Sequence, residues 1–372
     1  MVKKVVHVQL LPLLSGVQNV SLNEIKQMKD DFDFSVICSD EGDLTQALTD
    51  IGVSFYTINS LCREINLIKD LQSFYKLYKL LKDMKPDIVH THSSKTGFLG
   101  RIAAKFARVD NVIHTVHGFS FPSSNSFISR KIYYLMELVA TKFCDKIIVL
   151  NDSDYLITKN QLRVHPDKIE IIPNSVDTDL YRPLCSEVKD INEPLRVVMV
   201  GRLWEQKNPM CLIKAIKFIR DDGYNVTLDY VGDGELTNNI QKYVVANELY
   251  DCVRLLGWNK EVYKILPSYD IFVLPSLWEG MPLAILEAQA CGLPTVVSNI
   301  PGNKDLVIDG VNGYLFESDN YLDLKEKILL FTDKEKTKEM SVSARDHILS
   351  NYSSDKRNVK VSCLYNKGES CF

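Results

Sequence analysis

The sequence lacks any run of about 18 consecutive apolar residues, the length that a helix needs to cross a bilayer. Its N-terminus places Lys3 and Lys4 before an apolar stretch, as a signal peptide does. However, His7 and Gln9 interrupt that stretch, and no small-residue cleavage site follows. We therefore predict a first buried β-strand at this position. The expected location is the cytoplasm, with any membrane attachment limited to the membrane surface.

Motifs of several nucleotide-binding and metal-binding classes are also missing. The nine cysteines include no Cys-x-x-Cys pair, so we expect reduced thiols; Cys363 and Cys371 could pair, although two unrelated thiols are the favoured interpretation. The absence of a Gly-x-Gly-x-x-Gly fingerprint and of a complete phosphate-binding loop argues against a Rossmann dehydrogenase and a P-loop NTPase. A net charge of -4 gives no reason to expect nucleic-acid binding.

The sequence does contain a repeated alternation of short β-branched runs and helical stretches. Its 372 residues exceed one ordinary domain, so two domains are expected. Short apolar strands that alternate with helices form parallel sheets covered on both faces. Strands are predicted at residues 5–10, 34–38, 53–56, 88–90, 112–116, 146–150 and 169–172, and then at 196–200, 226–231, 253–256, 271–274 and 294–297.

A polar stretch with prolines at both ends separates the two groups of strands and predicts a linker over residues 183–194. We therefore expect an α/β protein with two Rossmann-like domains, residues 1–182 and 195–351, whose parallel sheets face each other across a cleft. Residues 352–372 should form a C-terminal helix. Ligands of such sheets bind beyond the carboxyl ends of the strands, so functional motifs should follow strands.

The strongest motif follows the strand at 271–274. Pro282 suits the first turn of a helix, whose free N–H groups form an anion site fitted to a diphosphate. Glu279 and Glu287 could accept hydrogen bonds from vicinal hydroxyls of a sugar and a ribose; the alternative is a helix cap and a solvated face. Apolar neighbours of Glu287 favour a partner for its carboxylate. The donor-site residues predicted here are Glu279, Gly280, Met281, Pro282, Leu283, Ala284 and Glu287.

A second motif follows the strand at 196–200. Gly201 ends the strand, and Arg202 and Lys207 appear in one loop before Pro209. Arginine offers a planar bidentate fork and lysine a point charge, so together they could neutralise a leaving diphosphate. A pair of surface cations is the alternative, but its position at the carboxyl end of a strand favours the site. We assign Gly201, Arg202 and Lys207 to the donor site.

Two loops of the first domain also follow strands. Gly16 permits close backbone approach to a ligand, although an ordinary tight turn explains it equally well. His117 ends a strand and precedes Gly118, so its imidazole could contact a transferring sugar or be satisfied within its own loop. His90 and His92 share one face of a strand and could bind a metal. No third ligand lies near them in the sequence, so hydrogen bonding is the favoured interpretation.

The segment 93–143 carries seven cations against two anions and contains an apolar, aromatic loop. A lysine-rich amphipathic helix is predicted just upstream, at 67–84. A basic surface with insertable aromatic side chains suits an anionic membrane or a lipid-linked phosphate acceptor, and a solvated helix face is the alternative. The predicted surface comprises Lys95, Arg101, Phe119, Phe121, Phe127, Arg130 and Lys131.

Together these residues resemble the retaining family 4 glycosyltransferases of the GT-B fold. The shared features are the spacing of Glu279 and Glu287, the Arg202–Lys207 loop, the Gly16 loop, the His117–Gly118 turn and the segment 172–177, in that family's order over nearly the whole chain. The stretch VHTHSSKTGFLGR at 89–101 further resembles bacterial enzymes that build capsule or O-antigen on undecaprenyl diphosphate.

The resemblance implies roles for individual residues. Arg202 and Lys207 would bind the donor diphosphate, Glu287 the ribose, Glu279 the sugar hydroxyls, and His117 the transferring sugar. The backbone of residues 281–284 and of Gly16 would help to hold the phosphates and the sugar. Ser175 stands where the family usually has glycine, and Val17 and Gln18 stand near a usual second Gly and Glu. These departures weaken the Gly16 assignment and leave the donor site intact.

The resemblance also implies an acceptor-side first domain, a nucleotide-sugar-binding second domain and a last helix that crosses back to the first. The expected enzyme is a metal-independent, cofactor-free hexosyltransferase with Arg202, Lys207, Glu279 and His117 as catalytic residues. It would move a sugar from a nucleotide diphosphate, UDP ahead of GDP, to an undecaprenyl-diphosphate-linked acceptor at the inner face of the cytoplasmic membrane. The alternatives are a nucleotide-sugar epimerase of related fold and a non-catalytic nucleotide-sugar-binding protein.

Overall fold

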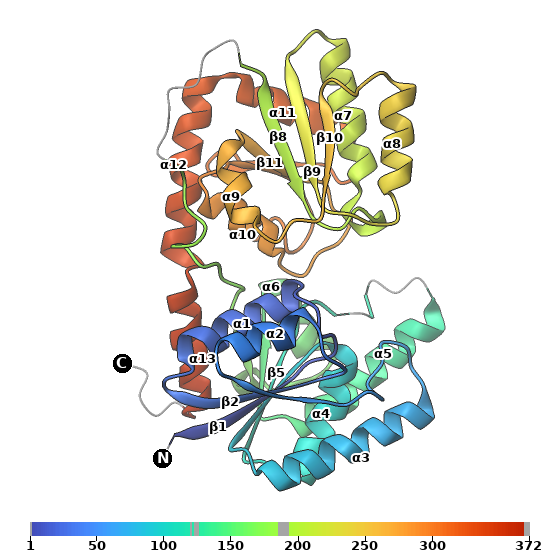
Figure 1. Ribbon diagram of the computed structural model, residues 1–372, viewed down its shortest axis with the longest axis vertical. Coiled ribbons are helices and arrows are strands. Elements are labelled where there is room, and N and C mark those ends of the chain that lie inside the picture. The colour runs from blue at the N-terminus through green and yellow to red at the C-terminus, as the bar shows by residue number, and fades with distance from the viewer. Residues whose placement is uncertain (1, 120, 123–125, 185–192, 368–372) are drawn as a thin grey trace. The chain divides into compact units, whose positions relative to one another are not determined.

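The computed structural model describes residues 2–119, 121–122, 126–184 and 193–367. It divides into two compact units, Met1–Asn174 with Ser354–Phe372, and Ser175–Ser353 (Figure 1). The structure thus draws the boundary after Asn174, where the sequence placed it after residue 182. Most of the predicted linker at 183–194 and the thiol of Cys371 lie outside the described residues.

The first unit is built on a seven-stranded sheet in which every pair of neighbouring strands is parallel. The strand order is β3-β2-β1-β4-β5-β6-β7, so the chain starts in the middle of the sheet and builds outward on both sides. The strands are β1 Lys3–Val8, β2 Phe32–Cys38, β3 Ser54–Thr57, β4 Ile88–His92, β5 Asn111–Thr115, β6 Lys146–Val149 and β7 Ile169–Ile171.

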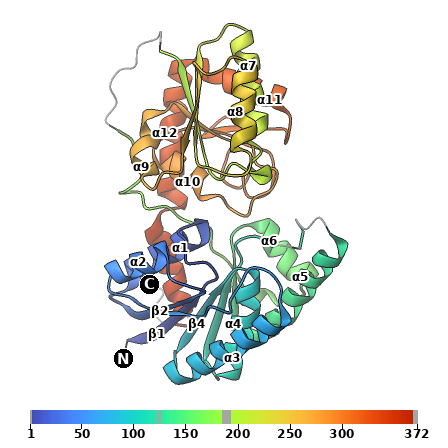
Figure 2. The ribbon, with the colours of Figure 1, turned by 45° about the vertical axis from the view of Figure 1, so that its right-hand side comes forward.

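Helices cover both faces of this sheet (Figures 1 and 2). One buried apolar cluster includes side chains of α1, α2 and α13, and the other includes side chains of α3 and α4, against which α5 packs. The last helix of the chain therefore completes the core of the first unit. The helices are α1 Gly16–Met28, α2 Asp43–Asp50, α3 Leu67–Met84, α4 Ser94–Phe106, α5 Phe127–Ala140, α6 Asp152–Leu156 and α13 Ser354–Tyr365.

Helix α3 shows how local sequence sets these elements. The Asn66 side chain accepts a hydrogen bond from the Lys69 N–H and caps the helix start. Leu77 and Leu81, one turn apart, are buried against the core. Lys85 adopts the left-handed conformation at the end, and Pro86 then prevents continuation. The structure confirms the helix predicted at 67–84.

The second unit contains a six-stranded parallel sheet in the order β10-β9-β8-β11-β12-β13. The strands are β8 Leu195–Val200, β9 Val226–Val231, β10 Val253–Gly257, β11 Ile271–Leu274, β12 Thr295–Ser298 and β13 Gly313–Phe316. Helix α7 packs against α11, and α10 packs against α12. The helices are α7 Pro209–Asp221, α8 Thr237–Ala246, α9 Val262–Ile265, α10 Leu283–Ala290, α11 Tyr321–Leu329 and α12 Lys334–Asn351.

The predicted α/β class with two parallel sheets is confirmed. Each of the twelve predicted strands overlaps a strand of the structure, and β13 was missed. β13 has four residues, lies at a sheet edge and follows Gly310, Asn312 and other turn-forming residues, so its sequence resembles a loop. No helix in the described parts of the chain combines the length and the apolarity that a membrane crossing requires.

Candidate active site

The two strongest motifs meet in the second unit because their strands are neighbours. β8 and β11 run parallel and side by side, so the loops that leave their carboxyl ends begin at the same sheet edge. The Leu277 N–H donates to the Gln206 carbonyl at 2.7 Å. The Gln206 side-chain amide donates to the Trp278 carbonyl, also at 2.7 Å. These two bonds join the loop of Arg202 and Lys207 to the loop of Glu279.

Lys207 and Glu279 form an ion pair at this junction. The Lys207 ammonium donates to Glu279 Oε1 at 2.6 Å, and the Ser276 hydroxyl donates to the same oxygen at 2.6 Å. Both charged side chains are largely shielded from solvent, with 17% and 8% of their side-chain surface exposed. The pair therefore holds a cation beside the loop that leads into α10. Ser276 was not singled out from the sequence, since it is one of several serines near strand ends.

Helix α10 begins at Leu283, with Pro282 as the residue just before the helix. The sequence predicted Pro282 inside the first turn of the helix. In the structure it is the N-cap residue, just before the first turn. The opening N–H groups of α10 therefore come from Leu283 and Ala284, which are the helix's first two residues. Gly302 approaches the preceding loop so closely that a Cβ would lie 2.4 Å from the Gly280 carbonyl oxygen. Only glycine fits there, and the close packing keeps the Gly280 loop in place.

Glu287 lies farther along α10 and carries a perturbed carboxyl group. Burial raises the pKa of Glu287 to about 7, and a hydrogen bond from the Tyr181 hydroxyl opposes part of that rise. Burial and the adjacent Glu287 charge raise the pKa of Tyr181. The partner that the sequence predicted for Glu287 is thus Tyr181, which lies over a hundred residues earlier and carried no local signal.

Arg202 forms an ion pair with Glu235, a partner that the sequence did not predict. Its guanidinium pairs with Glu235 at 2.5 Å and lies 5.1 Å from the centre of the Trp204 ring. The side chains of Arg202 and Glu235 are both exposed. In this structure Lys207 contacts Glu279 and Arg202 contacts Glu235, so the two cations do not share one partner.

In the first unit, Gly16 and His117 follow strands as predicted. Gly16 is the exposed first residue of α1, and a Cβ added there would meet nothing within 4 Å. His117 is half-buried beyond β5, with its Nε2 3.1 Å from His92 Nδ1. The imidazole therefore has a described partner on one side, and the backbone beside Gly16 is open to a ligand.

His7 joins His90 and His92 as a third buried ring. β1 and β4 pair with His7 opposite His90, and one potential ligand atom from each of the three rings lies within 4.8 Å of the others. Burial lowers the pKa of His7 to about 3 and lowers the pKa of His90 and His92 well below the usual range. The sequence missed this third ring because His7 is 83 positions before His90 and only strand pairing joins them.

The predicted basic surface is wrong at four of its residues. Lys95 is nearly buried and pairs with Asp70 at 2.6 Å, and Arg101 is fully buried and pairs with Glu137 at 2.7 Å. Phe119 and Phe121 belong to the apolar core between the sheet and its helices. Counting charges could not reveal these partners, because Asp70 and Glu137 lie on other helices. These four side chains are not available to a membrane.

Exposed apolar side chains nevertheless lie at the starts of α3 and α5, two helices that each pack against α4. Phe127 is 77% exposed, and the basic residues Arg130 and Lys131 follow it on α5. We call this set the α3–α5 apolar face, and its members are Leu67, Ile68, Leu71, Tyr75, Phe127 and Ile128.

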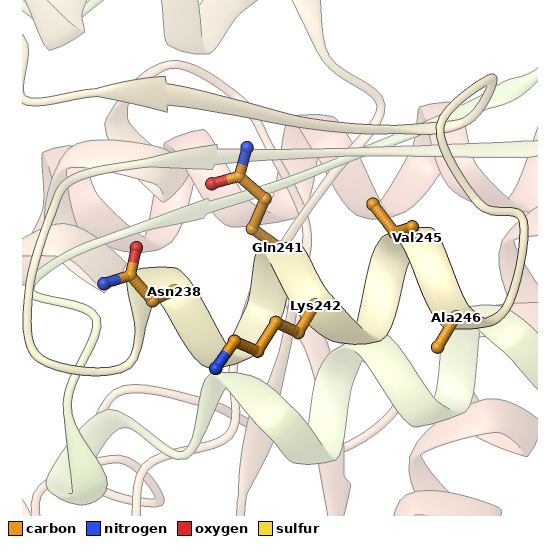
Figure 3. Close-up of a pocket in the computed structure, with 5 residues that line it drawn as sticks. All are labelled: Asn238, Gln241, Lys242, Val245 and Ala246. Atoms are coloured by element: carbon orange, nitrogen blue, oxygen red, sulfur yellow. The ribbon is translucent and has the colours of Figure 1, made fainter.

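A depression also lies over α8 (Figure 3). It is lined by Asn238, Gln241, Lys242, Val245 and Ala246. All five residues come from one helix, and none was predicted as a site residue. One face of a single helix cannot enclose a substrate, so this depression is not the candidate site.

Comparisons with known proteins give a consistent result. Two family models match the chain, Glycosyltransferase Family 4 over residues 14–180 and Glycosyl transferases group 1 over residues 186–347. The chain is 44% identical to an Escherichia coli UDP-Gal:alpha-D-GlcNAc-diphosphoundecaprenol alpha-1,3-galactosyltransferase, covering 97% of this chain and 96% of that protein. It is 27% identical to a Campylobacter jejuni N,N'-diacetylbacillosaminyl-diphospho-undecaprenol alpha-1,3-N-acetylgalactosaminyltransferase, covering 84% and 85%.

Solved structures agree on the fold. Anabaena HepE in complex with UDP-glucose matches with a TM-score of 0.83 at 19% identity, covering 98% of this chain and all of that one. The lipopolysaccharide outer core galactosyltransferase WaaB matches with a TM-score of 0.75 at 17% identity, covering 98% and 99%. These likenesses, together with the two parallel sheets, confirm the predicted GT-B fold.

Proposed function

This chain is a family 4 glycosyltransferase, and from that premise we propose that it transfers galactose from UDP-galactose to GlcNAc-diphosphoundecaprenol through an α-1,3 linkage. The observation that carries the proposal is the 44% identity to the Escherichia coli galactosyltransferase over nearly the full length of both chains. The Lys207–Glu279 pair and the half-buried Glu287 support it, because they supply a cation and two carboxylates in the loop and helix that follow β8 and β11. The product would extend a lipid-linked saccharide for a bacterial surface polysaccharide.

The proposed reaction breaks the bond between galactose C1 and the oxygen of the UDP β-phosphate. A bond from C1 to the acceptor hydroxyl oxygen forms on the same face of the sugar, which retains the configuration. The acceptor proton passes to the leaving phosphate oxygen. Negative charge grows on the diphosphate as the bond breaks, so preorganised positive groups lower the barrier.

We assign that charge stabilisation to Lys207, Arg202 and the opening N–H groups of α10. Glu279, held by Lys207 and Ser276, would accept hydrogen bonds from the sugar hydroxyls. Glu287 would accept them from the ribose. In this proposal Arg202 exchanges Glu235 for the diphosphate when the donor binds, which is inexpensive because the Arg202–Glu235 pair is exposed.

The proposed transfer needs no metal ion, because protein cations and helix N–H groups compensate the diphosphate charge. Excess EDTA should then leave the initial rate unchanged. Loss of activity in EDTA, with recovery on addition of Mg²⁺ or Mn²⁺, would show that a divalent cation takes part.

We further propose that the protein works at the anionic inner face of the cytoplasmic membrane. The α3–α5 apolar face supports this, since its α5 members Phe127 and Ile128 are exposed and come just before the cations Arg130 and Lys131 in the same helix. Contact there would bring the protein to an acceptor whose undecaprenyl chain lies in the bilayer.

The direct test uses purified protein with GlcNAc-diphosphoundecaprenol and a panel of UDP- and GDP-sugars, followed by mass spectrometry of the lipid product. The proposal expects a gain of one hexose with UDP-galactose and an α-1,3 linkage by glycosidase digestion or NMR. A gain with UDP-GalNAc alone would assign another donor. Conversion of the donor without acceptor would indicate an epimerase, and donor binding without turnover would indicate a non-catalytic binding protein.

A further inference from the structure

The buried histidines of the first unit are links in one continuous hydrogen-bond chain. The Thr115 hydroxyl lies 2.7 Å from His90 Nε2, and His90 Nδ1 lies 2.7 Å from the Tyr365 hydroxyl. The same hydroxyl lies 3.1 Å from His7 Nε2. From there the chain continues over 2.9 Å from His7 Nδ1 to His92 Nε2, and over 3.1 Å from His92 Nδ1 to His117 Nε2.

Such a chain has only two self-consistent arrangements of its protons. A neutral imidazole donates from one nitrogen and accepts at the other, and a hydroxyl has one proton to donate. The buried rings of His7, His90 and His92 are neutral, since desolvation lowers their pKa. Every link must pair a donor with an acceptor. If the buried Tyr365 hydroxyl accepted from both His90 and His7, its own proton would have no partner among the described residues, so it donates to one ring and accepts from the other. All donors therefore run either from Thr115 toward His117 or the opposite way.

Thr115 decides between the two directions. It is fully buried, and among the described residues its hydroxyl has no other partner within hydrogen-bond distance. If the chain ran toward Thr115, this hydroxyl would accept from His90 and its own proton would stay unpaired. A buried unpaired donor is unfavourable, so the chain runs from Thr115 outward. His117 Nε2 then accepts from His92, and the proton of His117 sits on Nδ1.

We propose that this chain is a positioning device that holds His117 as the Nδ1–H tautomer and so presents an N–H donor to the substrate. The positioning residues are Thr115, His90, Tyr365, His7 and His92. None of them needs to touch the substrate, because each acts only through the next link. The functional part of this inference rests on the proposed contact of His117 with the transferring sugar; the tautomer itself does not.

Histidine-selective ¹⁵N NMR tests the tautomer directly, and with only seven histidines in the chain the spectrum is sparse. His117→Gln assigns the His117 signals. The expected result in the wild type is protonation at Nδ1 in about tenfold excess, the ratio that one lost buried hydrogen bond would give. Predominant protonation at Nε2 would overturn the proposal.

The decisive variant is Thr115→Val, which removes the donor at the buried end with little change in shape. The two directions then become similar in energy, and the two tautomers of His117 should approach equal populations. The matched control is Thr91→Val on the neighbouring strand, since Thr91 is equally buried and bonds His114, outside the chain. Tyr365→Phe, which cuts the chain at its hydroxyl, gives the same test if Thr115→Val does not fold. A folded Thr115→Val protein with an unchanged tautomer ratio would contradict the proposal.

Activity provides the second measurement. With UDP-galactose and the lipid acceptor, Thr115→Val should lower kcat by about twofold, in proportion to the lost Nδ1–H population, while Thr91→Val keeps the wild-type value. If no donor is turned over, the proposed function fails, yet the NMR result still decides the tautomer. Metal analysis of the purified protein completes the test, because one equivalent of zinc held by His7, His90 and His92 would replace the hydrogen-bond chain by a metal site and refute it.

Discussion

Lys207 shows at the scale of one residue how a cation can be held ready for a ligand. Its ammonium uses one N–H for Glu279, and Glu279 is itself fixed by Ser276. An ammonium has three donors, so Lys207 can keep this contact and still reach a diphosphate oxygen. The ion pair with Glu279 thus positions the Lys207 ammonium and leaves it N–H donors for a diphosphate.

Replacing Lys207 by alanine should lower kcat about 10²-fold or more, because the growing charge on the leaving diphosphate loses a nearby cation. Steady-state kinetics with UDP-galactose measures this effect. Lys242→Ala, which removes an exposed lysine of α8, is the control and should leave kcat unchanged. If Lys207→Ala raised only the KM for the donor, the lysine would bind substrate and transition state equally.

Glu287 predicts a pH dependence of donor binding. Its pKa of about 7 means that protonation begins to remove the carboxylate acceptor as the pH falls through neutrality. The KM for UDP-galactose should therefore rise below about pH 7. The Tyr181 hydroxyl lowers this pKa by hydrogen bonding the carboxylate, so Tyr181→Phe should move the rise to higher pH.

The pH dependence is measured by comparing donor KM values at several pH values in the wild type and in Tyr181→Phe. Tyr134→Phe removes a hydroxyl that bonds the Gln161 carbonyl in the first unit, so it serves as the control with a wild-type profile. Identical profiles in all three proteins would mean that Glu287 does not titrate in this range or does not hold the ribose.

At the scale of elements, the sequence locates strand ends well because parallel strands leave a clear apolar signal. Glu279 and Lys207 were placed in loops after β11 and β8, and the structure brings them together because these strands are neighbours. The sequence did not predict the interaction partners that come from distant elements. Tyr181 for Glu287, Glu137 for Arg101 and His7 for His90 depend on tertiary contacts that no local pattern encodes.

The exposed apolar side chains at the start of α5 are expected to contribute to membrane binding. Changing Phe127 and Ile128 to serine removes two exposed apolar side chains and should weaken binding to phosphatidylglycerol vesicles by at least about tenfold. Vesicle sedimentation measures this loss. Val245→Ser removes an exposed apolar side chain from α8 and should bind vesicles like the wild type. Equal binding of all three proteins would exclude α5 as the contact.

At the scale of the whole molecule, helix α13 belongs to the same unit as the first strand, β1. Helix α13 returns to the first unit and places Val361 and Tyr365 in the same core as Val5. Arg357 fastens it there by pairing with Glu24 of α1 at 2.7 Å and donating to the Ile172 carbonyl at 2.8 Å. The core of the first unit therefore includes a helix that lies more than 300 residues after its first strand.

This arrangement predicts how substitutions in α13 change the stability of the first unit. Arg357→Ala should destabilise the first unit by about 3–5 kcal/mol, because it leaves Glu24 as a buried carboxylate without its cation. Glu24→Leu combined with Arg357→Leu removes both charges and should recover part of the loss, which denaturant unfolding measures. Lys360→Ala, which removes an exposed lysine of the same helix, is the control. If Arg357→Ala unfolded like the wild type, the helix would be held by its apolar contacts alone, and the buried ion pair would add nothing to the stability of the unit.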